Sequence, residues 1–252
     1  MIWLLAALIV VIGLPLGWAC AWFVHRYEDD DETDTAIFST ADCSSCGAVL
    51  LPLPTAARGG SCPECSTRLP ATWWITTLAL PASGLVMLAT WKDTMLLVPF
   101  LWLCVVGVVA SMVDIRLMLI PKRVVWVGLG VGLALILATT AWYEANDRPP
   151  GFESITDALI GAALYFGVLY AVWFVVPRGM GFGDVRLASV LGLYLGWIGL
   201  VLTFYGLLFG CAIGVVMGLI VRAVRKHKFF PFGPGMSLGA LVAIAMYETI
   251  LT

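Results

Sequence analysis

Charged residues are scarce in this sequence, since Asp, Glu, Lys and Arg make up only 12% of its 252 residues. A soluble globular domain carries about a quarter charged residues, so this composition excludes that class. A basic surface is also missing, because the formal net charge is −2, and we expect no binding of nucleic acid. Hydrophobic residues make up 61% of the chain, and the mean hydropathy is +0.98. These values predict a polytopic membrane protein in contact with the lipid bilayer.

Eight apolar segments approach or reach the roughly 20 residues that a membrane-spanning helix needs. We predict an all-α polytopic membrane protein with about eight transmembrane helices and a small zinc-ribbon-like insert between the first two. The chain then divides into a first transmembrane anchor at 1–24, a cytosolic insert at 25–71 and a membrane core of about seven helices at 72–252. The expected helices lie at about 2–24, 72–90, 95–113, 124–142, 155–177, 185–198, 200–221 and 235–251.

Lysine and arginine are distributed unequally between the two ends of the expected helices. If the N-terminus lies outside, twelve basic residues fall on the inner side, and only Lys92 and Arg148 fall on the outer side. Positive residues accumulate on the cytosolic side of membrane proteins, so we expect both termini outside and the 25–71 insert in the cytosol. No basic residue precedes the first segment, and His25 and Arg26 follow it. We therefore interpret this segment as a retained anchor and not as a cleaved signal peptide.

Four of the seven cysteines form two C-x-x-C motifs inside the insert, with fifteen residues between the motifs. Two such motifs at this distance are typical of one closed, tetrahedral structural zinc site. A pair of disulfides is an alternative, but the cytosol is reducing. A redox C-x-x-C is another alternative, although it would not need duplication. We predict that the zinc ligands are Cys43, Cys46, Cys62 and Cys65.

Two aspartates, Asp114 and Asp184, stand where an expected helix meets the cytosol, and each begins a short Asp-x-Arg-Leu sequence. Acids at membrane depth are costly and therefore indicate function. Two carboxyl groups brought together cannot both ionise easily; one can then take a proton from water while the other protonates a scissile carbonyl. We predict an aspartic hydrolase with this catalytic pair. Taken alone, this motif would favour the interpretation of Asp184 as a helix cap after a flexible loop. We expect that loop to lie close to substrate and to comprise Gly181, Phe182 and Gly183.

In their order along the chain, these features resemble the type IV prepilin leader peptidases, which are membrane aspartic proteases. The likeness rests on the two C-x-x-C motifs, on Asp114 seven residues before Pro121, on the Gly-x-Gly-Asp motif ending at Asp184, and on 231–234, which reads Pro-Phe-Gly-Pro. The resemblance implies that Asp114 and Asp184 are catalytic and that the four cysteines bind zinc. It implies a bacterial inner-membrane enzyme that removes the leader of type IV prepilins or pseudopilins, in pilus assembly or type II secretion.

The resemblance also implies a second activity, N-methylation of the new N-terminus with S-adenosylmethionine. Three positions depart from the family pattern: 21–26 lacks an asparagine, 70–74 lacks a glutamate, and Lys122 follows Pro121. The first two departures lie in the region linked to methylation, so a peptidase without methyltransferase activity is the alternative. A secondary transporter and a non-catalytic zinc-ribbon scaffold are two further alternatives. Transporter sites lie near the membrane midplane, whereas these aspartates lie at the inner edge.

Overall fold

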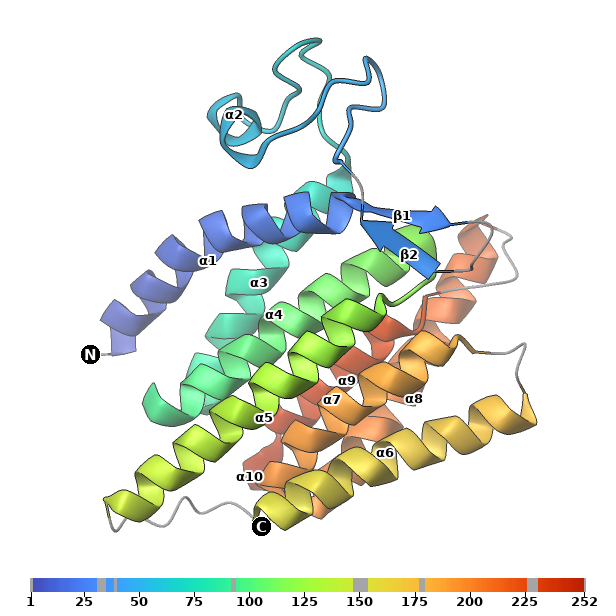
Figure 1. Ribbon diagram of the computed structural model, residues 1–252. Helices are drawn as coiled ribbons and strands as arrows, with labels where there is room; N and C mark the ends of the chain where they lie inside the picture. Colours follow the sequence, from blue (N-terminus) through green and yellow to red (C-terminus); the bar gives the residue numbers. More distant parts are fainter. Residues whose placement is uncertain are drawn as a thin grey trace.

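The computed structural model describes residues 2–30, 35–38, 40–91, 94–146, 154–176, 180–225 and 231–251. Figure 1 shows long helices packed into one bundle, with an insert around the short helix α2 projecting beyond one end of it. In chain order, the elements of the described residues are α1 (Ile2–His25), β1 (Tyr27–Asp30), β2 (Thr35–Phe38), α2 (Pro52–Ala57), α3 (Ala71–Thr90), α4 (Thr94–Leu117), α5 (Lys122–Ala145), α6 (Ile155–Val175), α7 (Phe182–Ile198), α8 (Leu200–Arg225), α9 (Gly233–Ala245) and α10 (Tyr247–Leu251).

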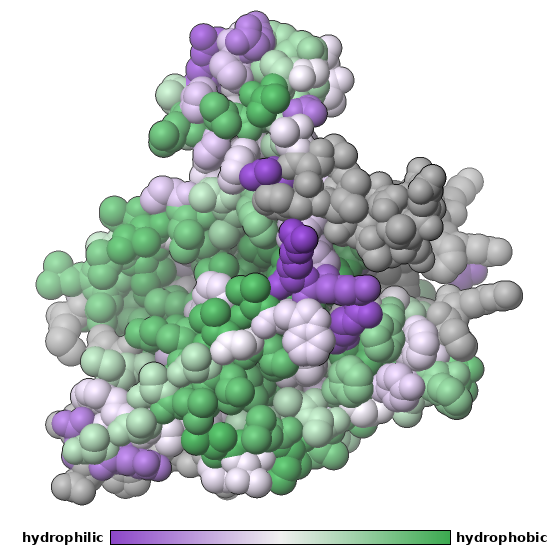
Figure 2. All heavy atoms as spheres, in the orientation of Figure 1, coloured by the Kyte–Doolittle hydropathy of each residue, from purple (hydrophilic) through white to green (hydrophobic). Residues whose placement is uncertain are grey.

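All eight predicted segments are helical, which confirms the fold class of a multi-pass membrane protein. Among the described residues, six helices are long and apolar enough to cross a membrane: α1, α3, α4, α5, α6 and α8. The remaining two segments form shorter helices: α7 has 17 residues and begins three residues before the predicted 185–198, and the last segment breaks at Met246 into α9 and α10. Figure 2 shows apolar side chains over most of the visible bundle surface, with hydrophilic residues on the insert, in a patch on the bundle below it and at the lower left end of the bundle.

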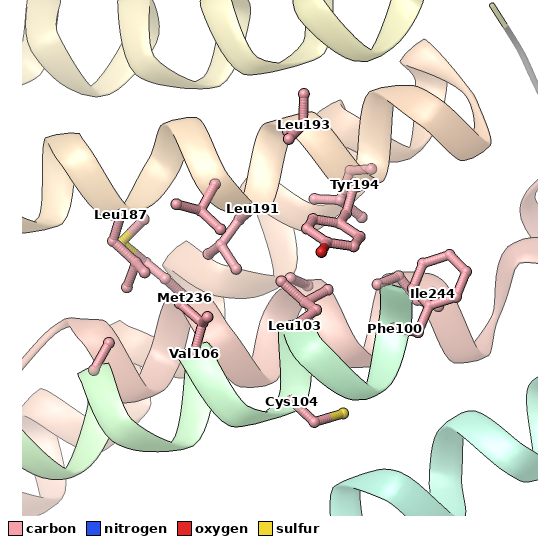
Figure 3. Packing of buried hydrophobic residues seen from close by; sticks show 14 of the residues in the cluster. Phe100, Leu103, Cys104, Val106, Leu187, Leu191, Leu193, Tyr194, Met236 and Ile244 are labelled. Carbon is pink, nitrogen blue, oxygen red and sulfur yellow. The ribbon is translucent and has the colours of Figure 1, made fainter. Parts of the chain in front are cut away.

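The short helix α7 is the centre of the bundle. It packs against α4, α5, α6, α8 and α9, and its residues are buried almost without interruption from Asp184 to Ile198. Figure 3 shows this core, in which Leu187, Leu191 and Tyr194 of α7 lie opposite side chains of α4 and α9. A helix enclosed by protein on every side needs no lipid-facing surface, which accounts for its modest length.

Glycines let α6 and α7 approach each other closely. A Cβ added to Gly161 would lie 2.5 Å from the Gly192 carbonyl oxygen and 2.6 Å from the Gly196 Cα. Such small-residue contacts are the usual way in which membrane helices gain packing. The C-terminal half of α7 is therefore fixed against the first part of α6.

The insert begins with a two-stranded antiparallel hairpin that hydropathy did not predict. Strands β1 and β2 pair in the register Tyr27↔Phe38 to Asp30↔Thr35. Three acidic residues, Glu28, Asp29 and Asp30, belong to β1.

Candidate active site

Asp114 lies near the C-terminal end of α4 and is 4% exposed. Its Oδ2 accepts a hydrogen bond of 2.8 Å from the backbone N–H of Gly233, the first residue of α9. A Cβ on Gly233 would lie 2.9 Å from the same oxygen, so a side chain at this position would displace the carboxyl. The contact joins residues 119 positions apart and fixes the Asp114 carboxyl against the start of α9.

Asp184 is the third residue of α7 and is 6% exposed. Its backbone N–H donates to the Gly181 carbonyl oxygen over 3.1 Å. One carboxyl oxygen, Oδ1, is buried and has no hydrogen-bond partner among the described residues. A buried polar atom without a partner is costly, and such atoms are often found where a ligand or a reacting group binds.

The structure corrects two local expectations about this motif. The N-cap of α7 is Gly181, so Asp184 is not the cap residue. Phe182 and Gly183 are not loop residues, since they form the first two positions of α7. The reason is that the start of α7 packs directly on other elements, which favours a helix over the irregular backbone suggested by the glycines.

The two aspartates are brought together through Ile120. A Cβ on Gly183 would lie 2.9 Å from Ile120 Cβ, and a Cβ on Gly233 would lie 3.3 Å from Ile120 Cδ1. Ile120 therefore lies between the segment that carries Asp184 and the glycine that binds Asp114. The two carboxyl groups also interact electrostatically. The predicted pair is thus one buried site, which we call the dyad.

Phe182 packs on α6. Its ring centroid lies 4.9 Å from that of Trp173, and the Arg186 guanidinium lies 4.5 Å above its ring. The corresponding arginine on α4, Arg116, donates a hydrogen bond to the Val24 carbonyl at the end of α1. Arg116 therefore joins α4 to α1, whereas the contact of Arg186 lies within α7, on the ring that packs against α6.

The sequence analysis assigned no role to two residues of this site. Gly233 belongs to the quoted Pro-Phe-Gly-Pro motif, and the prolines around this glycine were a usable signal of a special turn. Ile120 carried no signal, because nothing distinguishes it from the other apolar residues around it.

The four predicted metal ligands form one cluster. The Sγ atoms of Cys43, Cys46, Cys62 and Cys65 all lie within 4.8 Å of one another. Cys43 and Cys65 are 3.6 Å apart at sulfur, and Cys46 and Cys62 are 3.7 Å apart. Four sulfurs at about 2.3 Å around a tetrahedral ion are separated by about 3.8 Å, whereas a disulfide measures about 2.05 Å. The cluster therefore has metal-site geometry, and all four cysteines are free of disulfides.

The two C-x-x-C motifs have matching backbones. The Gly47 N–H donates to the Cys43 carbonyl over 2.9 Å, and the Ser66 N–H donates to the Cys62 carbonyl over 3.0 Å. Gly47 and Ser66 occupy equivalent positions with positive φ angles of 72° and 58°. Hydrogen bonds with the side chain and backbone of Thr67 lower the pKa of the Cys65 thiol. This favours the thiolate that a metal requires.

Tryptophans attach the insert to the bundle. The Trp18 indole donates to the Pro52 carbonyl over 2.9 Å, and the Trp22 indole donates to the Leu50 carbonyl over 2.7 Å. His25 of α1 lies 3.1 Å from the Thr72 hydroxyl at Nε2, at the start of α3. The two segments that depart from the resembled pattern, 21–26 and 70–74, are therefore neighbours beside the insert.

Comparison with known protein families covers the residues of the dyad. The profile of the type IV leader peptidase family matches residues 97–221, a range that contains both Asp114 and Asp184. The chain belongs to the type IV leader peptidase family. No solved structure matches it.

Curated relatives of this family member carry the name prepilin leader peptidase/N-methyltransferase. The protein from Aeromonas hydrophila is 29% identical over 203 residues, which cover 76% of this chain and 64% of the relative. The protein from Pseudomonas putida is 24% identical over 96% of this chain and 86% of the relative. The protein from Bacillus subtilis is 24% identical over 84% of each chain. The chain thus spans less than two thirds of the Aeromonas relative and most of the other two.

Proposed function

We propose that this family member is an aspartic endopeptidase that removes the leader peptide of type IV prepilins or pseudopilins. The observation that carries the proposal is the dyad itself, because two buried carboxyl groups from α4 and α7 share one site at helix ends. The names of the curated relatives supply the substrate class. The end positions of Asp114 in α4 and Asp184 in α7 argue against a midplane transporter site.

The surroundings of the two carboxyl groups suggest different roles for them. The Gly233 N–H faces Asp114 Oδ2 and favours its carboxylate form, which suits a base that takes a proton from the attacking water. The buried Oδ1 of Asp184 has no partner among the described residues, so a proton there would lower its cost of burial. In this proposal Asp184 donates that proton to the carbonyl oxygen of the scissile bond. The peptide then passes through a neutral tetrahedral intermediate.

The four-cysteine cluster fits zinc as a structural ion. Cys43, Cys46, Cys62 and Cys65 would fill all four positions, so the ion would bind no water and would stabilise the insert. We place the insert in the cytosol and both termini outside the inner membrane, on the distribution of basic residues. The prepilin cleavage site would then meet the dyad at the cytosolic face.

N-methylation with S-adenosylmethionine is the finer part of the proposal and rests on the relatives' names. A cavity of about 380 Å³ between α1, α4 and α5 lies near the departing segment 21–26. Its polar lining is limited to Cys20, Tyr27, Trp102 and Arg123, with no carboxylate or amide side chain to bind a ribose or an amino group. These residues do not fit S-adenosylmethionine, and we derive no methylation step from them.

Cleavage by the reconstituted protein tests the proposal. Wild type, Asp114→Asn and Asp184→Asn would each be incubated with a type IV prepilin and S-adenosylmethionine, and the products followed by mass spectrometry. We expect leader removal by wild type and its loss in both variants, with the fold checked by thermal unfolding. A further gain of about 14 Da on the wild-type product would demonstrate methylation. Cleavage at the wild-type rate by either folded variant would refute the dyad and favour a non-catalytic scaffold.

A further inference from the structure

An apolar cavity of about 160 Å³ lies between α3, α4, α7 and α9. No charged side chain lines it, and its hydroxyl groups come from three serines: Ser83, Ser111 and Ser237. Figure 3 shows four of its lining residues, Leu103 and Cys104 on α4, Leu191 on α7 and Ile244 on α9.

The cavity lies directly beside the dyad. Ser111 precedes Asp114 by three residues, so the two share one face of α4 about 4.5 Å apart along its axis. Leu191 follows Asp184 by seven residues, two turns along the same face of α7. Pro234 adjoins Gly233, whose N–H binds Asp114. Helix α4 ends near the dyad, and α7 and α9 begin there. Ser111, Leu191 and Pro234 therefore each lie farther from the helix ends than the dyad does, toward the inside of the bundle.

One side of the cavity is incompletely covered. Leu238 is 48% exposed, and Ala79 and Ser83 of α3 are partly exposed where α3 meets α9. Ser237 adds a polar group, because its Oγ is buried and has no hydrogen-bond partner among the described residues. A peptide entering along this seam would find an apolar space together with one unpaired hydroxyl.

The size of the cavity indicates what it can hold. An engineered cavity of about 150 Å³ in another protein binds benzene, so a space of this size accommodates a phenyl ring or a leucine side chain. Its apolar lining excludes a charged group, whose burial would be uncompensated. The part of a substrate that lies on the membrane side of the dyad must itself be apolar.

We propose that this cavity is a subsite for one large apolar side chain of the substrate, from the residues on the membrane side of the scissile bond. The inference rests on the proposed peptidase function and deepens it. Gly107 is the specificity-determining residue, because its missing side chain keeps the middle of the cavity open. The Ser237 hydroxyl pairs with the peptide backbone, which cannot be helical where it is cleaved.

A leucine at position 107 tests the subsite. A Cβ on Gly107 would lie 3.6 Å from Ser237 Cβ and Oγ, an ordinary contact, so the rest of the side chain can extend into the cavity. Gly130→Leu is the matched control, because a Cβ on Gly130 of α5 would meet nothing within 4 Å. For each enzyme, kcat/KM would be measured with a type IV prepilin and with four variants of it. Each variant carries alanine at one of the first four large apolar residues after the cleavage site.

We expect Gly107→Leu to lower kcat/KM for the parent prepilin about tenfold or more, the range for a lost apolar contact in a pocket, and Gly130→Leu to leave it unchanged. At one substrate position, alanine should lower the kcat/KM of the wild-type enzyme by a similar factor. The same alanine should lower the kcat/KM of the Gly107→Leu enzyme little further, because the subsite is already filled. An unchanged kcat/KM in a folded Gly107→Leu protein would overturn the subsite. So would independent effects, in which each of the four alanine substitutions lowers kcat/KM by the same factor in the Gly107→Leu enzyme as in wild type.

A second measurement covers a Gly107→Leu protein that fails to fold. Photo-leucine placed at each of the same four prepilin positions would be cross-linked to the Asp114→Asn enzyme, which holds the substrate uncleaved. Cross-links to α3 or α9 residues support the subsite, and cross-links confined to other helices contradict it. Failure of the peptidase function itself looks different, because the wild-type enzyme would then leave the parent prepilin uncut.

Discussion

Replacement of Gly183 by alanine should damage catalysis far more than it damages the fold. The new Cβ would lie 2.9 Å from Ile120 Cβ and 3.1 Å from the Ile120 backbone nitrogen. Carbon atoms pack best at about 3.5 to 4.0 Å, so the overlap with the first atom is about 0.6 to 1.1 Å. Both Ile120 atoms belong to or adjoin its backbone, so no rotation of the isoleucine side chain relieves the overlap. Either the start of α7 or the segment around Ile120 must move.

The magnitudes separate stability from activity. Overpacking costs about 1–3 kcal/mol, and alanine returns up to about 1 kcal/mol relative to glycine inside a helix. The net loss of stability is therefore about 0–3 kcal/mol. Asp184 is the next residue, and a displacement of about 1 Å near reacting groups can cost about a hundredfold in rate. We expect kcat/KM for prepilin cleavage to fall by a factor of about ten to a hundred.

Gly181→Ala is the matched comparison within the same motif. A Cβ there would lie 3.5 Å from Asp184 Oδ2, and the φ angle of −70° suits any residue. The backbone groups that bind Asp184 are retained, so we expect kcat/KM within about threefold of wild type, as for other substitutions that add no overlap. Cleavage kinetics and thermal unfolding of both variants would be measured together. Equal kcat/KM for Gly183→Ala and wild type would refute the requirement for contact with Ile120.

Three further predictions concern the scaffold. Removal of the metal by a chelator, or Cys62→Ser, should unfold the insert while the membrane helices persist, because structural zinc sites supply the folding energy of small domains. The tryptophan emission should shift as zinc is lost, because the indoles of α1 lose their hydrogen bonds to carbonyls of the insert. An unchanged emission spectrum would contradict this. Gly192→Ala should lower the unfolding temperature strongly, since its Cβ would lie 2.8 Å from Tyr165 Cβ, whereas Gly167→Ala, with nothing within 4 Å, should not; equal unfolding temperatures would refute the close α6–α7 contact. Ser154→Ala removes the capping box at the start of α6, where the serine hydroxyl and the Asp157 side chain bind each other's backbone, and should cost about 0.5–2 kcal/mol in thermal unfolding.

Hydropathy predicted where the helices are but not how they end. Each of the eight segments is apolar over most of its length, because contact with lipid or with the core requires apolar side chains whichever helices are its neighbours. The break of the last segment at Met246 and the β1–β2 hairpin depend on local backbone geometry and pairing, which mean hydropathy does not report. Ser66 illustrates the same limit, because its positive φ is imposed by the second metal motif and serine gives no warning of it.

The candidate site was predictable in its chemistry and not in its contacts. Asp114 and Asp184 stand out because acids are rare at the ends of apolar helices. The hydrogen bond from Gly233 to Asp114 spans 119 residues, and no local pattern indicates such a pairing. The approach of Gly183 to Ile120 is a property of two packed surfaces, so it too becomes visible only in three dimensions.

The way in which the dyad is built constrains how the site can change. Asp114 is bound by a backbone N–H, and the backbone N–H of Asp184 is bound by the carbonyl of its N-cap, and no polar side chain of the described residues donates a hydrogen bond to either carboxyl. Backbone donors cannot be exchanged by substitution, but they can be pushed away where a side chain added at their own position overlaps a neighbour, as at Gly233. Glycine at positions 183 and 233 therefore lets both segments approach Ile120 closely, because a Cβ at either position would crowd that residue. Substitutions around the dyad should consequently act through main-chain displacement, and the polar surroundings of both carboxyl groups should survive most side-chain changes nearby.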